Sequence, residues 1–333
     1  MAIVAGTSIG KPRIFIDYVS YLSAVGGVTG YSGSPDLWDM NPSKVTETPL
    51  SNSCSDSENC LSDYYSVIFD SGYEIDNFLS TTNYFAALGH NTNGSHYRID
   101  RSTDVTFAAY SHTNYAPGAG NAYELPGYKI DTLSHPFTSP YYGTENVYSA
   151  YLYTTQNPTN PSVGSFSAGR YFDFPHSTDL NVSFVLSHEG IKTKRTIGGR
   201  DITNINYHSQ PLWGDRKPWT SGETYKYTGY NGRRSWRVSF SYIDHDDALP
   251  KDTNEDFMLD YTVGHPDLGV AHATENIVSH FLSLTLNGSL KFIFQPDVTL
   301  DQFALCRLSK TQTTFKQVAH KTYDVSFTFV ETY

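Results

Sequence analysis

The sequence predicts a mainly β fold, and three observations point to it. Aromatic residues make up 15% of the 333 residues, including 26 Tyr and 19 Phe, which favour strands. Glycine (25) and proline (16) recur along the whole length, as many turns require. Several segments alternate apolar and polar side chains, which indicates half-buried strands. A chain of this length suits two domains better than one.

Two strand candidates mark the beginning and end of the first half. RIFIDY at 13–18 alternates apolar and polar residues, and VYSAYLY at 147–153 is rich in aromatic and β-branched residues. The following Pro- and Asn-rich stretch, 154–165, is the best boundary candidate. It predicts two domains, 1–163 and 164–333.

A hairpin and two long loops are predicted within the first half. The apolar segment 83–90 is followed by an Asn-Gly turn at 91–95 and by an alternating segment, 96–100. A strand, such a turn and a second strand are typical of a β-hairpin. Residues 26–63 and 113–145 are rich in turn-forming residues and are predicted to be loops.

The second half contains regular alternation. The segment 181–187 places Val, Phe and Leu on one side, and 192–197 and 202–207 are strand candidates around two glycines. WRVSFSYI at 236–243 alternates as well. The last strand, 323–333, is predicted to leave a free sheet edge, which a second subunit would use.

One helix is predicted after residue 274. Thr274 is the expected N-cap and Glu275 suits the positive end of the helix dipole. Gly288 is expected to end the helix. Apolar residues and one threonine recur at helical spacing: Ile277, Val278, Phe281, Leu282 and Thr285.

Composition also excludes several functions. The net charge is −11 and only 17% of residues are charged, which argues against nucleic-acid binding and against docking on an anionic membrane. No segment approaches the roughly 20 apolar residues that span a bilayer. The N-terminal residues do not form a signal peptide pattern. Three cysteines do not make a disulfide framework. Cys54 and Cys60 are expected to be free thiols, with a disulfide that closes a small loop as the alternative, and Cys306 is expected to be a buried apolar residue.

Catalytic patterns are incomplete. The segment Gly164–Gly169 resembles a serine elbow, but its spacing is wrong and it is predicted to lie in the linker. His188-Glu189 is not followed by the second histidine of a zinc protease. No pair of carboxylates stands out for glycoside hydrolysis. The chain is therefore predicted not to be an enzyme and to need no cofactor.

Metal sites are not predicted either. The histidines show no ligand spacing, and the best calcium-like loop, Asp252–Asp256, lacks the required glycine and the late bidentate acid. Solvated acidic loops and hydrogen-bonding histidines explain these residues better. The residues explained in this way are the acidic loop residues Asp56, Glu58 and Asp63, the segment His245–Asp247, and the histidines His265, His272 and His280.

Two segments resemble proteins of bacteriophage virions. Asn83-Tyr-Phe-Ala-Ala-Leu-Gly-His-Asn91, followed by Gly94 and a strand, resembles a segment of virion proteins that carry a galactose-binding-like jelly roll. The span 170–333 is similar to the tail-tube-type β-sandwich of distal tail and baseplate-hub proteins, and to uncharacterised virion proteins of marine phages. The motifs are Tyr171–Asn181, Gly198-Gly199, Gly232–Phe240, Lys291–Asp297 and Phe303–Leu308.

These resemblances imply a role in assembly. The chain is expected to be a distal tail, baseplate or tail adaptor ring protein that connects the tail tube to fibres. The implied fold is a jelly-roll-like domain 1–163 and a tail-tube-like β-sandwich 164–333 with one packed helix. The expected partners are further copies in a symmetric hexamer or trimer and other tail, baseplate or fibre proteins. The expected location is the virion tail, after assembly in the host cytoplasm.

Interface candidates are arginine and aromatic residues of the second half. Basic residues at 192–200 and 233–237 stand out in an acidic chain and are expected to pair with an acidic neighbouring subunit. The candidates are Arg233, Arg234, Trp236, Phe281, Phe327 and Phe329.

Carbohydrate binding is the alternative function. Jelly rolls bind glycans through loop aromatics, although such residues also serve protein interfaces. The candidates are Tyr115, Tyr123, Tyr141 and Tyr142 on the predicted loop. A depolymerase is a more distant alternative.

Overall fold

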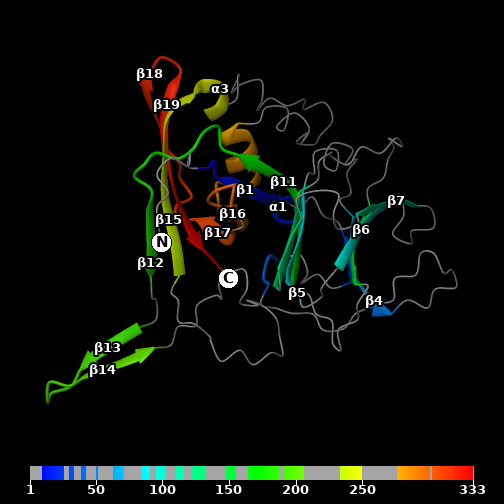
Figure 1. Cartoon of the computed structure of the whole chain (residues 1–333), viewed down its shortest axis with the longest axis horizontal. Coiled ribbons are helices and arrows are strands. Elements are labelled where there is room, and N and C mark those ends of the chain that lie inside the picture. Colours follow the sequence, from blue (N-terminus) through cyan, green and yellow to red (C-terminus); the bar gives the residue numbers. More distant parts are fainter. Residues whose placement is uncertain are drawn as a thin grey trace.

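The chain is mainly β in the computed structural model, as predicted (Figure 1). The structure describes residues 10–25, 30–33, 39–42, 50–51, 63–70, 84–90, 95–102, 110–115, 122–125, 127–132, 147–154, 164–187, 191–205, 233–249, 276–300 and 302–332. Within these ranges it has 19 strands and three short helices.

The largest sheet has 11 antiparallel strands. Strand β12 lies at one edge and β8 at the other, and β18 (Phe315–Ala319) pairs with β19 outside the main path. The order along the path is β12 (Ser183–Ser187), β15 (Arg233–Asp244), β19 (Thr322–Glu331), β17 (Ala304–Leu308), β16 (Phe292–Gln295), β1 (Arg13–Asp17), β11 (Ser165–Asp173), β5 (Tyr84–His90), β9 (Gly127–Thr132) and β8 (Ala122–Leu125).

Both halves of the chain contribute to this sheet. Strand β1 lies between β11 and β16, so Ile14 is opposite Phe172 on one side and Phe294 on the other. Strand β5 also pairs with β11. The predicted division at residue 163 therefore does not coincide with a break in the sheet, and the domain boundary stays a prediction.

A second sheet is built from the first half alone. Its order is β2 (Gly30–Gly33), β4 (Asp63–Asp70), β10 (Val147–Thr154), β6 (Ser95–Ser102) and β7 (Tyr110–Tyr115), and β3 (Leu50–Ser51) pairs with β4. The predicted hairpin of 83–90 and 96–100 is wrong, because β5 and β6 belong to different sheets. The apolar residues of β5, 84–88, are buried, and the strand pairs with β9 and β11 rather than with its neighbour in sequence.

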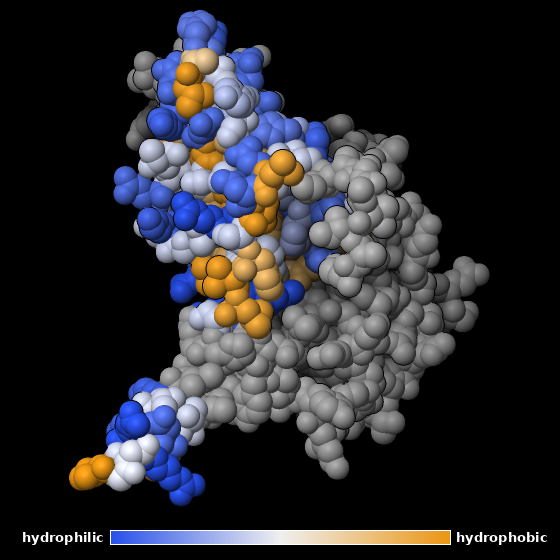
Figure 2. Space-filling view, turned by 60° about the vertical axis from the view of Figure 1, so that its left-hand side comes forward, coloured by the Kyte–Doolittle hydropathy of each residue, from blue (hydrophilic) through white to orange (hydrophobic). Residues whose placement is uncertain are grey.

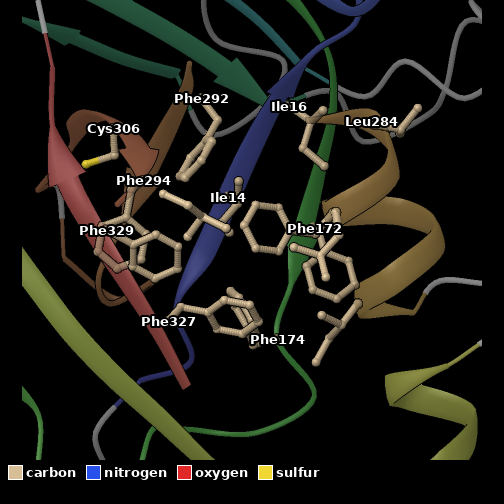
Figure 3. Packing of buried hydrophobic residues seen from close by; sticks show 14 of the residues in the cluster. Ile14, Ile16, Phe172, Phe174, Leu284, Phe292, Phe294, Cys306, Phe327 and Phe329 are labelled. Atoms are coloured by element: carbon tan, nitrogen blue, oxygen red, sulfur yellow. The ribbon is translucent and has the colours of Figure 1, made fainter. Parts of the chain in front are cut away.

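The main core fills the space between the curled sheet and its helices (Figure 3). Ile14 and Ile16 of β1 point into this core. Across it, Phe174 stacks on Phe240 of β15 with ring centroids 4.5 Å apart, so β15 faces the end of β11 as in a sandwich. A second cluster on the other face of the sheet contains Phe15, which buries β1 on both sides.

Strand β11 corrects the assignment of Gly164–Gly169 to a linker. This segment, which is made of small residues apart from Phe166, is buried in the sheet. A Cβ atom at Gly169 would lie 2.1 Å from the carbonyl oxygen of Ile16, so only glycine permits this approach of β1. Small side chains that resemble a linker in the sequence here allow two strands to pack closely.

Three helical segments flank the large sheet. The helix η2 (Ile277–Leu282) occupies the predicted place and has π-type geometry, while α1 (Tyr18–Val25) and α3 (His245–Ala248) were not predicted. The N-cap of η2 is Asn276, whose side-chain oxygen accepts a hydrogen bond from the Ser279 amide at 2.8 Å. The predicted cap, Thr274, lies outside the described residues. The helix ends at Leu282, with Ser283 as its C-cap, so the prediction that Gly288 ends it is wrong. Gly288 lies further on, after Leu286 and Asn287, and all three have positive φ.

Candidate assembly surface

Strand β12 is an edge of the large sheet. It pairs with β15 on one side, where Phe184 is opposite Trp236 and Leu186 is opposite Arg234. In the described part of the chain, no strand pairs with its other side. One row of backbone amide and carbonyl groups along β12 therefore faces outward.

Five large apolar side chains on and before β12 are exposed. Figure 2 shows hydrophobic residues gathered on the side of the molecule that carries this strand. We call this set the β12 ledge. Its residues and exposed fractions are Leu180 (91%), Val182 (42%), Phe184 (55%), Val185 (51%) and Leu186 (46%).

The ledge is a continuation of the core. Residues opposite one another in antiparallel strands share a face, so Phe184 lies on the same face as Trp236. Their rings are 5.6 Å apart, and Trp236 in turn contacts Phe294 at 5.5 Å. Trp236 is only 8% exposed whereas Phe184 is 55% exposed. The apolar layer thus runs past the last covered strand into solvent.

The edge lacks the usual protection against pairing. Edge strands commonly carry lysine, proline or a bulge that prevents association. Strand β12 reads Ser-Phe-Val-Leu-Ser, and its register with β15 is regular. A regular, uncharged, apolar edge is suited to contact with another protein chain.

Arg234 is used inside the subunit. Its guanidinium forms an ion pair with Glu331, with Nη2 and Oε1 2.6 Å apart, and its backbone amide donates to the same carboxylate at 3.0 Å. The guanidinium also lies 5.2 Å from the Trp236 ring. Glu331 is 2% exposed, so this pair joins β15 to β19 beneath the ledge.

The structure separates the six predicted interface residues into two groups. Arg233, Arg234 and Trp236 lie on β15 beside β12, which places them next to the ledge. The other three are core residues, which corrects their assignment to an interface: Phe281, Phe327 and Phe329 are at most 3% exposed and contact one another.

The predicted free edge is also at a different strand. The last strand, β19, pairs with β15, β17 and β18, so it lies inside the sheet. Alternation in a sequence indicates a strand but not its position in the sheet. The sequence did show that β12 has neither charge nor proline, and this was the available signal for the ledge.

A two-stranded hairpin projects beyond the sheets (Figures 1 and 2). Strands β13 (Ile191–Arg195) and β14 (Asp201–Ile205) confirm the two strands predicted around the glycines, each ending two residues earlier than predicted, and they pair with each other. Within 191–205, four basic residues accompany one acidic residue. Arg195 and Asp201 are 3.9 Å apart and exposed, so this ion pair adds little stability.

The described glycan candidates lie on strands of two different sheets. Tyr115 and Tyr123 lie on strands β7 and β8, not on the predicted loop, and these strands belong to different sheets. Tyr141 and Tyr142 lie outside the described residues, as do Cys54, Cys60 and the segment 252–256.

A network of buried hydrogen bonds around Asp17 holds three strands of the large sheet together. Asp17 accepts hydrogen bonds from the Ala168 amide at 3.1 Å, from the Ser167 hydroxyl at 3.2 Å and from the amide and hydroxyl of Ser20. Ser167 also bonds the Tyr84 hydroxyl at 2.7 Å. This network joins β1, β11 and β5 and caps α1.

Cys306 is fully buried, as expected, and burial raises the pKa of its thiol well above the ordinary range. Across the residues with described positions, no group of three or more side chains is placed to hold a metal ion. No helix in that same part of the chain is long and apolar enough to cross a membrane.

Compared with known proteins, the chain matches no family model, no curated protein and no solved structure.

Proposed function

We propose that the chain is a structural component of a phage virion, in a distal tail, baseplate or tail adaptor ring that connects the tail tube to fibres. The observation that carries the assembly role is the β12 ledge. The virion assignment is supported by the resemblance of Asn83–Asn91 and of residues 170–333 to virion proteins.

Assembly explains the ledge better than chemistry does. An apolar edge strand exposed on both faces favours association, because water is released and the free backbone groups gain partners. The proposed partners are further copies of the chain in a symmetric ring and other tail, baseplate or fibre proteins. Assembly would take place in the host cytoplasm and leave the chain in the virion tail.

The test is to locate the chain in particles. Gradient-purified virions of the phage that encodes the chain are labelled with gold-conjugated antibody raised against it and imaged by electron microscopy. Label at the tail end is expected, and particles made without the chain should have defective tails. Antibody preabsorbed with the purified chain is the control. Virions that lack the chain, with all of it in the soluble fraction of the lysate, would contradict the proposal.

A further inference from the structure

We infer that β12 pairs with β12 of a second copy, antiparallel and centred on Val185, so that two large sheets join across a two-fold axis. The inference rests on the proposed assembly role of the ledge and names its occupant. It follows from the order of residues along the strand, the exposed area and the position of charges.

The strand is complementary to itself. Pairing about Val185 places Val185 opposite its own copy, Phe184 opposite Leu186 and Ser183 opposite Ser187. Within Ser183–Ser187, every apolar side chain then meets an apolar one and every serine meets a serine. The other two ledge residues, Leu180 and Val182, lie before this matched segment. No charged residue occurs within Ser183–Ser187, so no like charges are opposed directly.

The other edge of the sheet is a poorer partner for β12. Strand β8 has four residues, Ala122–Leu125, and carries Glu124. Pairing β12 with β8 would place a carboxylate against an uncharged strand. Pairing β12 with β8 would be a head-to-tail contact, which builds a ring or a filament. Pairing β12 with itself closes at two copies, so within the proposed assembly it would join the subunits of two rings, and another surface would form the ring itself.

Area sets the strength of the contact. The five ledge side chains, of roughly 150–200 Å² each, are 42–91% exposed and leave about 500 Å² per copy. A contact that covers all five in both copies therefore buries about 1,000 Å². Specific interfaces begin at roughly this size. The pair is therefore expected to be concentration-dependent rather than permanent.

Charge does not oppose the pair. Arg233, Arg234 and Arg237 lie on β15, so their counterparts in the second copy are three strand spacings away, about 14 Å. Salt screens charges beyond about 8 Å at physiological ionic strength. Antiparallel pairing also places the two projecting hairpins, which follow the C-terminal ends of the β12 strands, at opposite ends of the contact.

Charge reversal at the axis tests the pairing. The full-length chain and its Val185→Lys and Val185→Glu variants are compared by sedimentation velocity over a micromolar concentration series. The wild type should dimerise, and each variant alone should dimerise at least 10-fold more weakly, because two like charges face each other. An equimolar mixture of the variants should recover the dimer as a heterodimer, detected by native mass spectrometry. Val318→Lys is the matched control, since Val318 is 40% exposed on strand β18.

A cysteine at the axis tests the register. Cα atoms directly opposite in antiparallel strands are about 4.5–5.5 Å apart, within the range of a disulfide. Val185→Cys should form a covalent dimer on mild oxidation, whereas Val318→Cys should not. The natural cysteines are present in both variants and give the background.

Three results would overturn the pairing: a wild-type chain that stays monomeric at 100 micromolar, association that Val185→Lys does not weaken, or larger oligomers without a crosslink at Val185→Cys. These outcomes are separate from the proposed function. A monomeric chain found in virion tails overturns only the pairing, whereas a dimer absent from virions overturns only the virion role.

Discussion

Removal of the Asp17 carboxylate should destabilise the large sheet. In Asp17→Ala, helix α1 loses its cap, which costs about 1 kcal/mol. The buried Ala168 amide loses the acceptor it now has at 3.1 Å, which costs about 1–3 kcal/mol. Ser167 keeps its bond to Tyr84 and adds little to the loss. The free energy of unfolding should fall by about 2–4 kcal/mol.

The measurement is urea unfolding followed by tryptophan fluorescence. Asp247→Ala is the control, because Asp247 is exposed on α3, and its unfolding free energy should change by less than about 0.5 kcal/mol. If Asp17→Ala unfolds within about 0.5 kcal/mol of the wild type, the Asp17 network does not stabilise the fold as argued.

The pH dependence gives a second readout of the same group. Burial raises the pKa of Asp17 above its ordinary value of 3.8, although the hydrogen bonds from Ser20, Ala168 and Ser167 act the other way. A raised folded-state pKa means that the folded chain holds the proton more tightly than the unfolded chain. The resulting stabilisation is complete below the unfolded-state pKa and is lost as pH rises through the folded-state pKa. The stability of the wild type relative to Asp17→Asn should therefore fall as pH rises from below 3.8. An increase over this window would refute the assignment.

Three further changes test the core and its polar links by the same unfolding measurement. Phe281→Ala should cost about 3–5 kcal/mol, because a fully buried ring leaves a cavity, and a cost below about 1 kcal/mol would contradict its place in the core. Arg234→Ala should lower the free energy of unfolding by about 3–5 kcal/mol, because Glu331 stays buried without its cation. Once Arg234 is absent, adding Glu331→Ala should cost much less than Glu331→Ala does in the wild type. Strictly additive losses would contradict the ion pair. Gly288→Ala should lower the free energy of unfolding by at least about 1 kcal/mol, because φ is +72° and the new Cβ would clash with the side chain of Leu308 on β17. Gly198→Ala meets nothing within 4 Å and should be neutral, and equal effects would contradict this account.

Local patterns predicted elements well. Alternation located β12, β15 and β19, and the paired glycines located the turn between β13 and β14. Apolar spacing located the helix η2, whereas Gly288 did not mark its end. These features depend on neighbours in sequence, which a single sequence contains.

Pairing between distant segments could not be predicted. The Asn-Gly turn after β5 suggested a local hairpin, yet β5 gains more burial from β11, which begins 75 residues after β5 ends. The same limit misplaced the free edge, because the sequence predicts both β12 and β19 as strands without showing which one lies at the edge. Asp17 was read as part of a strand, and its capping of α1 depends on Ser20 and on a strand from the other half of the chain. The sequence therefore predicted that β12 is a strand, but not that its apolar side chains form an exposed surface.

The position of β1 also bears on the order of events during synthesis. Both neighbours of β1 are made much later than β1 itself, since β11 begins at Ser165 and β16 ends at Gln295. At 5–20 residues per second, β1 leaves the ribosome about 15–60 s before its second neighbour. The large sheet can therefore close only when almost the whole chain is available, and such non-local closure is slow. During that interval the apolar strand β1 is a natural substrate for chaperones, and truncated chains that end before β16 should not form the sheet.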